Sequence, residues 1–472
     1  MRLPRLRVLL TTASALLACR LGAAPELAPL FQDHAVLQRD LPVPVWGRAA
    51  PGEHVSVSFA GQSVGATAGP DGRWITVLAP LSASTSGSDL VATGRSAVAV
   101  HDIVVGEVWL CSGQSNMEFE VDDAAAGYRV ENDAAEVAAA RYPLIRQFKV
   151  ARQASDTPMD SVRGDWKACS PGTVGHFTAV GYFFARDLFA RLGVPIGLIN
   201  STAASTPIEA WMSPLALAAF PRFSNGHVAG RAAPGLEDPW VPSSVFNGMI
   251  QPLLPCALRG VIWYQGESNV GRASDYAALF PALISAWRTH FGAADLPFFW
   301  VQLPAFKPAK PDPAEGWAAL REAQAGALSV PGTGQAVAID IGEAGNPHPR
   351  NKQEVGRRLA LIAKAKVYSI PVDYSGPVFS GAVAEGAAMR VHFQFAGEGL
   401  TASGKPLQSF EVAGADRQFR PAVAVIQGDS VVARSAMVPH PVAVRYAWRD
   451  DPEANLFNGA GLPAAPFRSD DW

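Results

Sequence analysis

The sequence predicts an α/β protein: a central parallel sheet covered by helices and flanked by two β-rich regions. Three observations support this. Residues 25–105 contain short runs that alternate apolar and polar side chains, such as HVSVSF. Residues 106–370 alternate continuous apolar strands with helical segments, which is typical of a parallel sheet with both faces covered. Residues 371–472 return to strand-like alternation, for example in MRVHFQF, so we expect a second small β domain there.

A leader precedes these regions. Three arginines come before a short apolar run, residues 8–18, which is too short to span a bilayer. We interpret residues 1–24 as a cleaved signal peptide, which implies a secreted or periplasmic protein. The segment LLAC, ending at Cys19, resembles a lipoprotein cleavage site and would leave a lipid anchor; the alternative is cleavage near Ala23 or Ala24. No later segment reads as a transmembrane helix.

Composition restricts the class of function. Of 472 residues, 49% are apolar and 17% charged, which permits a large core and excludes global disorder. A net charge of -3 without a Lys/Arg cluster argues against a nucleic-acid partner. Beyond the leader the cysteines are Cys111, Cys169 and Cys256. They lack CxxC spacing, so we expect buried thiols rather than a thiolate metal site.

The first region has the turn chemistry of a β-sandwich. Its strand-like runs, among them VPVWG, HVSVSF and RWITVLAP, are separated by turn segments such as APGE and GPDGR.

The central region predicts five strands and at least two helices. One helix is expected over Thr178–Leu192, where apolar residues fall on one face and Gly193 supplies the stop. Another, KQEVGRRLALIAKA, begins shortly after His348. The strand candidates are EVWLC, PIGLINS, RGVIWYQ, PFFWVQL and QAVAID.

Polar clusters follow four of these strands. They are SGQSN, TAASTPIEAW, GESN and IGEAGNPHPRNK. Ligands of open parallel sheets bind beyond the carboxyl ends of the strands, so these clusters are expected to meet at one rim.

Ser115 lies in the first cluster and fits a nucleophile on a tight strand-to-helix turn. A serine hydroxyl needs a base, and His348 is the best candidate because it follows the last strand and precedes a helix. The other histidines fall in the β regions or away from strand ends. A turn serine that caps a helix is the structural alternative for Ser115 taken alone.

An acyl-transfer site also needs donors aimed at the developing oxyanion. The candidates are the N–H of Ser115, a backbone N–H at Ala204 or Ser205, and the side-chain amide of Gln265 or Asn269. For the two amides, ordinary loop hydrogen bonding is the alternative interpretation.

The segments GQSNMEF, IEAW, WYQGESN and HPRNKQEVGRRLAL together resemble the sialate O-acetylesterase family of carbohydrate esterases, which belong to the SGNH/GDSL-type hydrolases. The resemblance covers nearly the whole mature chain. It implies an SGNH-like central domain and a serine hydrolase, independent of metal and cofactor, that removes acetyl groups from sugar hydroxyls, most typically the 9-O position of sialic acid.

The resemblance also implies roles for particular residues. Ser115 would be the nucleophile and His348 the base, with Gln265 and Asn269 in the oxyanion and substrate region. Two carboxylates, Glu209 and Glu267, would lie near the pocket and orient loops or sugar hydroxyls.

The chain departs from the family pattern in two places. Where the family commonly has Trp-Gly-Gly-Thr, this chain has Ala-Ala-Ser-Thr at 203–206, which removes an aromatic wall and the freedom of glycine to adopt positive φ. Before His348, Gly345 and Asn346 stand where related hydrolases often carry an Asp. Asp340, Glu343 or a backbone carbonyl are the candidates to orient the imidazole, and a Ser-His dyad is the alternative.

Three other functions fit this pattern. One is an acetylesterase of xylan or another plant polysaccharide on the same scaffold. Another is a catalytically impaired glycan-binding protein, which the two departures favour. A lipid esterase has weaker support, because the sequence contains no contiguous apolar lid segment.

Overall fold

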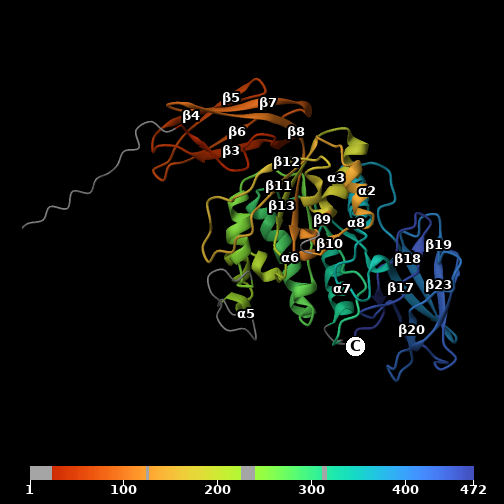
Figure 1. Ribbon diagram of the computed structural model, residues 1–472. Coiled ribbons are helices and arrows are strands. Elements are labelled where there is room, and N and C mark those ends of the chain that lie inside the picture. The colour runs from red at the N-terminus through yellow and green to blue at the C-terminus, as the bar shows by residue number, and fades with distance from the viewer. Residues whose placement is uncertain (1–23, 124–126, 225–239, 311–315) are drawn as a thin grey trace, which may run out of the picture.

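A computed structural model describes residues 24–123, 127–224, 240–310 and 316–472. Figure 1 shows strands of the N-terminal region at one end, a helix-covered sheet in the middle, and the C-terminal strands at the other end. The predicted signal peptide, with Cys19, lies outside the described residues except for Ala24. Within the described ranges, no helix combines the length and apolarity needed to cross a membrane.

The central sheet has the order β12-β11-β13-β8-β14-β15-β16. All neighbours are parallel except β12, which pairs antiparallel with β11 at the edge. The predicted parallel sheet is therefore extended at this edge by an antiparallel strand that the sequence analysis did not predict, and the sheet is mixed. Its strands are β8 (Ala97–Gly113), β11 (Ile145–Lys149), β12 (Trp166–Ala168), β13 (Ile196–Thr202), β14 (Gly260–Tyr264), β15 (Phe298–Val301) and β16 (Thr333–Ala336).

Helices cover both faces of this sheet. Trp109 of β8 packs against Phe184 of α3, and α3 packs on α8. Ser112 points to the opposite face of β8. Its neighbour Trp263 in β14 packs there against Trp287 of α6. The helices are α1 (Ser115–Glu118), α2 (Asp133–Ala139), α3 (Ala179–Leu192), α4 (Pro214–Leu217), α5 (Pro221–Ser224), α6 (Ala273–His290), α7 (Trp317–Gly326) and α8 (Lys352–Lys366).

The helix predicted over Thr178–Leu192 is confirmed as α3. Thr178 is its N-cap and accepts a hydrogen bond from the backbone N–H of Gly181, and Gly193 ends the helix in the left-handed conformation at φ 66°.

The N-terminal region is continuous with the central sheet through β8. The first part of this long strand pairs with β7 and β2, and its last part pairs with β13 and β14. The predicted boundary between residues 105 and 106 lies inside this strand. A separate sheet, β1-β3-β6, packs on the other side of the N-terminal core. The strands are β1 (Glu26–Leu27), β2 (Val36–Gln38), β3 (Val43–Arg48), β4 (His54–Phe59), β5 (Gln62–Thr67), β6 (Arg73–Leu78) and β7 (Ser84–Thr93).

The C-terminal strands form two four-stranded sheets around a core of their own, which includes Val391, Val412 and Tyr446. One sheet contains β17 (Val378–Glu385), β18 (Ala388–Gln394), β22 (Val423–Gln427) and β23 (Ser430–Arg434). The other contains β20 (Phe410–Ala413), β21 (Arg420–Pro421), β24 (Ala443–Tyr446) and β26 (Phe467–Arg468). Two short pairs complete the strands: β19 (Leu400–Thr401) with β25 (Phe457–Asn458), and β9 (Asp122–Asp123) with β10 (Tyr128–Arg129).

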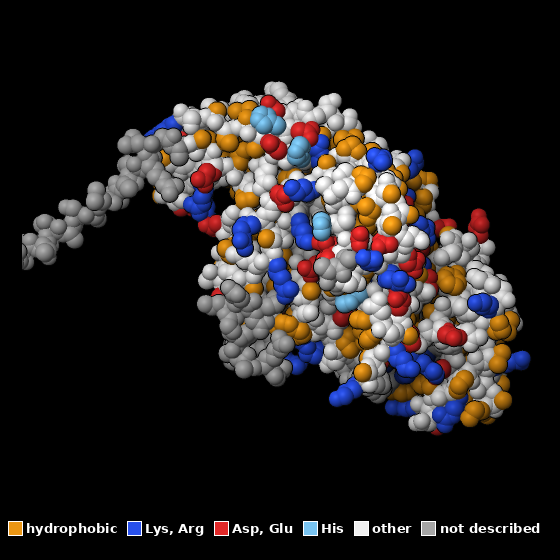
Figure 2. Space-filling model, in the orientation of Figure 1, with side chains coloured by type: hydrophobic (Ala, Val, Ile, Leu, Met, Phe, Trp, Pro, Cys, Tyr) orange, Lys and Arg blue, Asp and Glu red, His pale blue; other side chains and the backbone are white. Residues whose placement is uncertain are grey.

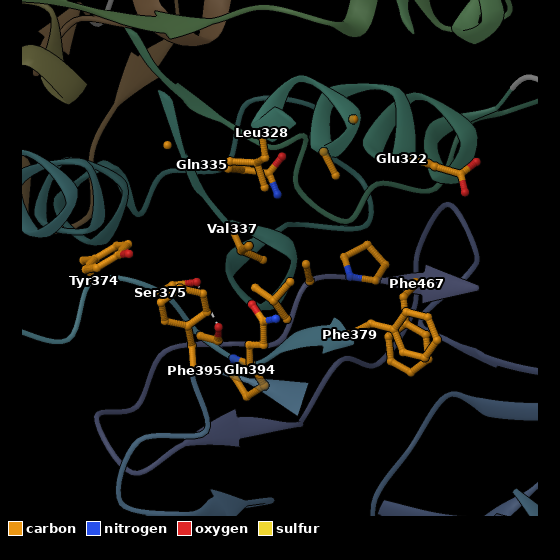
Figure 3. A pocket seen from close by; sticks show the side chains of 18 of the residues that line it. Glu322, Leu328, Gln335, Val337, Tyr374, Ser375, Phe379, Gln394, Phe395 and Phe467 are labelled. Carbon is orange, nitrogen blue, oxygen red and sulfur yellow. Dashed lines mark hydrogen bonds between the residues drawn. The ribbon is translucent and has the colours of Figure 1, made fainter. Parts of the chain in front are cut away.

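A pocket of about 520 Å³ lies where the C-terminal sheets meet α7, α8 and β16. Figure 3 shows Tyr374, Phe379 and Phe395 on its C-terminal side and Glu322 and Gln335 on its central side. The face of the molecule in Figure 2 carries Lys/Arg and Asp/Glu side chains interspersed with one another.

The three described cysteines after the leader are free thiols, and Cys111 and Cys169 are buried as the sequence predicts. Cys256 is partly exposed.

Candidate active site

Ser115 lies at the carboxyl end of β8, the strand at which the chain order of the sheet reverses. The strand ends at Gly113, Gln114 makes the turn, and α1 begins at Ser115. Gly113 has φ 132°, and a Cβ there would lie 2.2 Å from the carbonyl oxygen of Tyr264 in β14. Only glycine therefore allows the turn to pass so close to the neighbouring strand. The position is the switch point at which α/β sheets bind ligands.

The structure brings His348 to Ser115. The ring Nε2 of His348 lies 2.8 Å from the Oγ of Ser115, a hydrogen-bond distance between residues 233 positions apart. The rings of Tyr128 and His348 pack in a T-shaped arrangement, with 5.5 Å between their centroids.

Burial and, to a smaller extent, the positive charge of Lys352 together lower the pKa of His348 to about 4. The imidazole is consequently neutral near pH 7 and able to accept a proton.

Neither predicted orienting carboxylate contacts the imidazole. Asp340 binds the guanidinium of Arg358 with both oxygens, at 2.6 and 2.7 Å. Glu343 accepts hydrogen bonds from Asn346 Nδ2 and from the backbone N–H of Arg350, and so holds the loop that carries His348. Asn346 in turn accepts from the backbone N–H of His348 at 2.9 Å. Among the described residues, no group hydrogen-bonds to Nδ1 of His348.

The backbone donors proposed for an oxyanion differ in availability. The N–H groups of Ser115 and Ser205 have no acceptor among the described residues. The N–H of Ala204 instead donates to Glu118 Oε2 at 2.6 Å. The N–H predicted at Ala204 thus already has the half-buried carboxylate of Glu118 as its acceptor. Ser205 is exposed and has φ 62°, the conformation that glycine would adopt without strain.

The amides of Gln265 and Asn269 belong to a buried scaffold. Gln265 Nε2 donates to Gln114 Oε1, Thr206 O and Asn269 Oδ1 at 3.2, 3.1 and 2.8 Å. Asn269 Nδ2 donates to Glu209 Oε2 at 3.0 Å. Both amide hydrogens of Gln265 are therefore engaged, whereas Asn269 Nδ2 has one acceptor, Glu209, among the described residues.

Glu209 completes this scaffold rather than facing a ligand. It is fully buried and forms a 2.5 Å ion pair with Arg272. The loops after β13 and β14 are thereby tied together behind the nucleophile turn.

Glu267 belongs to a second cluster, with the buried residues Asn116 and Lys352, which sequence reasoning missed. Its Oε1 accepts from Asn116 Nδ2, and the amide oxygen of Asn116 accepts from Lys352 Nζ. One signal was available in the sequence: Lys352 is the first residue of α8, where the helix dipole disfavours a cation. A lysine there indicates a specific partner.

Arg152 was also missed. Its side chain is exposed and donates from Nη2 to the carbonyl oxygen of Ala204 at 3.2 Å, which places a guanidinium at the rim beside the Ser115 turn. Arg152 forms no salt bridge with any described residue.

The pocket in Figure 3 is separate from this site, because neither Ser115 nor His348 lines it. In the described ranges, no group of three or more His, Cys, Asp or Glu residues is arranged to hold a metal ion.

Comparison with known proteins agrees with this geometry. Residues 105–363 match the family model described as carbohydrate esterase, sialic acid-specific acetylesterase. The sialate O-acetylesterase of Rattus norvegicus is 29% identical over an alignment of 521 positions that covers 94% of each chain. That of Homo sapiens is 31% identical over 392 residues, 76% of this chain and 74% of the relative. The crystal structure of a carbohydrate acetylesterase from Xanthomonas citri is 42% identical, covers 95% of this chain and 100% of its own, and superposes with a TM-score of 0.87.

The family match spans the strands, turns and helices that carry Ser115 and His348, and it includes every residue of the central sheet after the first part of β8. The chain therefore belongs to the sialic acid-specific acetylesterase family of carbohydrate esterases and is a carboxylic ester hydrolase.

Proposed function

We propose that the protein is an SGNH-like serine esterase that removes O-acetyl groups from carbohydrates, with the 9-O-acetyl group of sialic acid as its substrate. One observation carries the mechanism: the 2.8 Å contact between Ser115 Oγ and His348 Nε2 at a sheet switch point. An imidazole held neutral by burial is a competent acceptor for the serine proton.

Acylation forms one bond and breaks one. Ser115 Oγ attacks the acetyl carbonyl carbon while its proton passes to His348 Nε2, which gives a tetrahedral oxyanion. The free N–H groups of Ser115 and Ser205 are the donors proposed for this oxyanion. The bond to the sugar oxygen then breaks, and His348 returns the proton to that oxygen.

Deacylation repeats the sequence with water. Water attacks the acetyl group on Ser115 and gives a proton to His348. The second tetrahedral intermediate collapses, acetate leaves, and the proton returns to Ser115 Oγ. No metal ion enters either step.

Arg152 supports an acidic sugar as substrate. Its guanidinium lies at the rim next to Ala204 and is not neutralised by an ion pair with the described residues. Guanidinium groups bind carboxylates well, and sialic acid carries a carboxylate whereas xylan backbone sugars do not. The names of the relatives from Rattus norvegicus and Homo sapiens point to the same substrate class.

The first test is hydrolysis of an aryl acetate by Ser115→Ala. We expect turnover to fall by a factor of at least 10³, since the nucleophile is gone. Ser112→Ala is the matched control: it removes a buried hydroxyl without a hydrogen-bond partner from the end of the same strand. Full turnover by folded Ser115→Ala would refute the mechanism.

The second test separates the substrates. Acetate release is measured from 9-O-acetylated sialic acid and from acetylated xylan, with wild type and Arg152→Gln. We expect preference for the sialic acid ester, and a roughly 10-fold loss of that preference in the variant. Release from xylan alone would identify a plant-polysaccharide esterase. Sugar binding without labelling of Ser115 by a fluorophosphonate would identify a glycan-binding protein.

A further inference from the structure

We propose that Asn116, held in place by Lys352 and Glu267, is a positioning residue that keeps His348 aligned with Ser115. This inference rests on the proposed serine mechanism and concerns residues that do not touch the substrate. It follows from the hydrogen bonds of one side chain, from its place between the two reacting residues, and from the burial of its partners.

Every polar atom of the Asn116 side chain is engaged. Its Oδ1 accepts from Lys352 Nζ at 2.5 Å, and its Nδ2 donates to Glu267 Oε1 at 2.5 Å and to the carbonyl oxygen of Pro347 at 2.9 Å. An ammonium group only donates, and carboxylate and carbonyl oxygens only accept. The partners therefore permit one orientation of the amide.

The position of Asn116 makes this orientation relevant to the reaction. Asn116 directly follows Ser115, and Pro347 directly precedes His348. The hydrogen bond from Asn116 Nδ2 to Pro347 thus joins the nucleophile turn to the histidine loop across 231 positions of sequence. His348 has no partner at Nδ1 among the described residues, so its backbone and its contact with Tyr128 must orient it. The link through Asn116 fixes that backbone from the Ser115 side.

The two charged partners are shielded from water, Lys352 completely and Glu267 in part. The side chain of Lys352 is fully buried, with its Nζ 4.8 Å from the ring centroid of Phe119 and 5.3 Å from that of Tyr264. Burial lowers the pKa of Lys352 to about 7 and raises the pKa of Glu267. Asn116 lies between the two charges, which do not form a direct salt bridge.

Removing charges from water is costly, and apolar residues of the same size usually stabilise a core as well or better. Buried ionisable groups next to a reactive pair are instead typical of functional sites. We infer that this cluster is retained for the orientation and electrostatics of the site.

Lys352 also acts on His348 through its charge. Among the described residues, Ser115 and Tyr128 contact the imidazole, and the charge that lowers its pKa is that of Lys352. Glu267 and Glu343 face Lys352 in turn. A positive charge disfavours imidazolium, so removing it raises the pKa of His348.

The test compares two variants with wild type. Lys352→Met keeps an unbranched chain of similar length but loses the charge and the donor, and Asn116→Ala removes the link itself. For both we expect kcat on an aryl acetate to fall roughly 10- to 100-fold with KM within about threefold, because a displaced base slows chemistry more than binding. For Lys352→Met we also expect the acid limb of kcat/KM to move to higher pH.

Lys366→Met is the matched control. Lys366 lies at the other end of α8, where its Nζ donates to the carbonyl oxygen of Thr333 and lies over the ring of Tyr374. Its loss should leave both kcat and the acid limb unchanged. Near-UV circular dichroism, which does not depend on the reactivity of Ser115, corrects every rate for the fraction of folded enzyme.

The outcomes are distinct. A kcat within about twofold of wild type in either folded variant overturns the positioning role. An acid limb that stays in place in Lys352→Met overturns the effect of the Lys352 charge on His348. If Lys352→Met does not fold, Asn116→Ala decides through its kcat. Should Ser115→Ala retain turnover, the proposed function itself fails; an inactive Ser115→Ala with fully active Asn116→Ala refutes only this inference.

Discussion

Esterase activity should persist well below the pH at which an ordinary histidine is protonated. The base must be neutral to accept the serine proton, and burial lowers the pKa of His348 from 6.5 to about 4. At pH 5 a histidine with a pKa of about 4 is about 90% neutral, whereas one with the ordinary value is about 3% neutral. The kcat/KM at pH 5 should therefore be close to its plateau rather than about 30-fold below it.

The assay is hydrolysis of an aryl acetate from pH 3.5 to 8, with each sample returned to pH 7 and assayed again to confirm that it is still folded. A half-maximal kcat/KM at pH 6.5 or above would refute the reasoning. The cause can be tested separately with Tyr128→Ala. Tyr128 covers one side of the imidazole, so its removal should admit water, raise the pKa of His348 and move the midpoint to higher pH.

Three further predictions concern the loops around the site. Gly113→Ala should lower the melting temperature and abolish most activity, because the added Cβ would lie 2.2 Å from Tyr264 O in a conformation that disfavours L-residues. Ser205→Gly should leave stability unchanged or raise it by up to about 1 kcal/mol in urea unfolding, whereas Ser205→Val should lower it by roughly 1–2 kcal/mol, because Ser205 has φ 62°. Asp340→Asn should destabilise by roughly 3 kcal/mol while the folded fraction keeps its kcat; a selective loss of kcat would instead return Asp340 to the role of orienting residue.

The convergence of Ser115 and His348 could be predicted because it depends on a general property of parallel sheets. Both residues follow strands, and the carboxyl ends of parallel strands lie on one edge. The helix α3 could be predicted because its signals are local: a threonine cap, an apolar face and a terminal glycine.

The functions of the amides and carboxylates could not be predicted in the same way. Gln265 and Asn269 follow a strand as a ligand-binding pair would, but their partners Gln114, Thr206 and Glu209 lie elsewhere in the chain. A sequence gives the capacity of an amide to donate, not the direction in which it donates. The antiparallel edge strand β12 was missed for a related reason, since its pairing with β11 depends on a loop rather than on its three residues.

The two expected effects of Lys352 belong to different states of the enzyme. In the free enzyme, protonation of His348 creates a positive charge with no oxyanion beside it. The nearby cation of Lys352 therefore opposes this protonation and moves the acid limb of kcat/KM to lower pH. In the transition state the imidazolium forms together with an oxyanion of opposite sign. The fixed positive charge of Lys352 disfavours the imidazolium and favours the oxyanion, so its two effects on the activation barrier partly cancel.

The effect of Lys352 that does not cancel in the transition state is the positioning of His348. The ammonium of Lys352 still fixes the amide of Asn116, and Asn116 still holds the backbone next to His348. The charge of Lys352 should thus be read mainly from the pH dependence of kcat/KM, and its hydrogen bond mainly from the size of kcat. A neutral hydrogen-bond donor in place of Lys352 would separate the effect of its charge from that of its hydrogen bond. It would retain the orientation of Asn116 while the pKa of His348 rises.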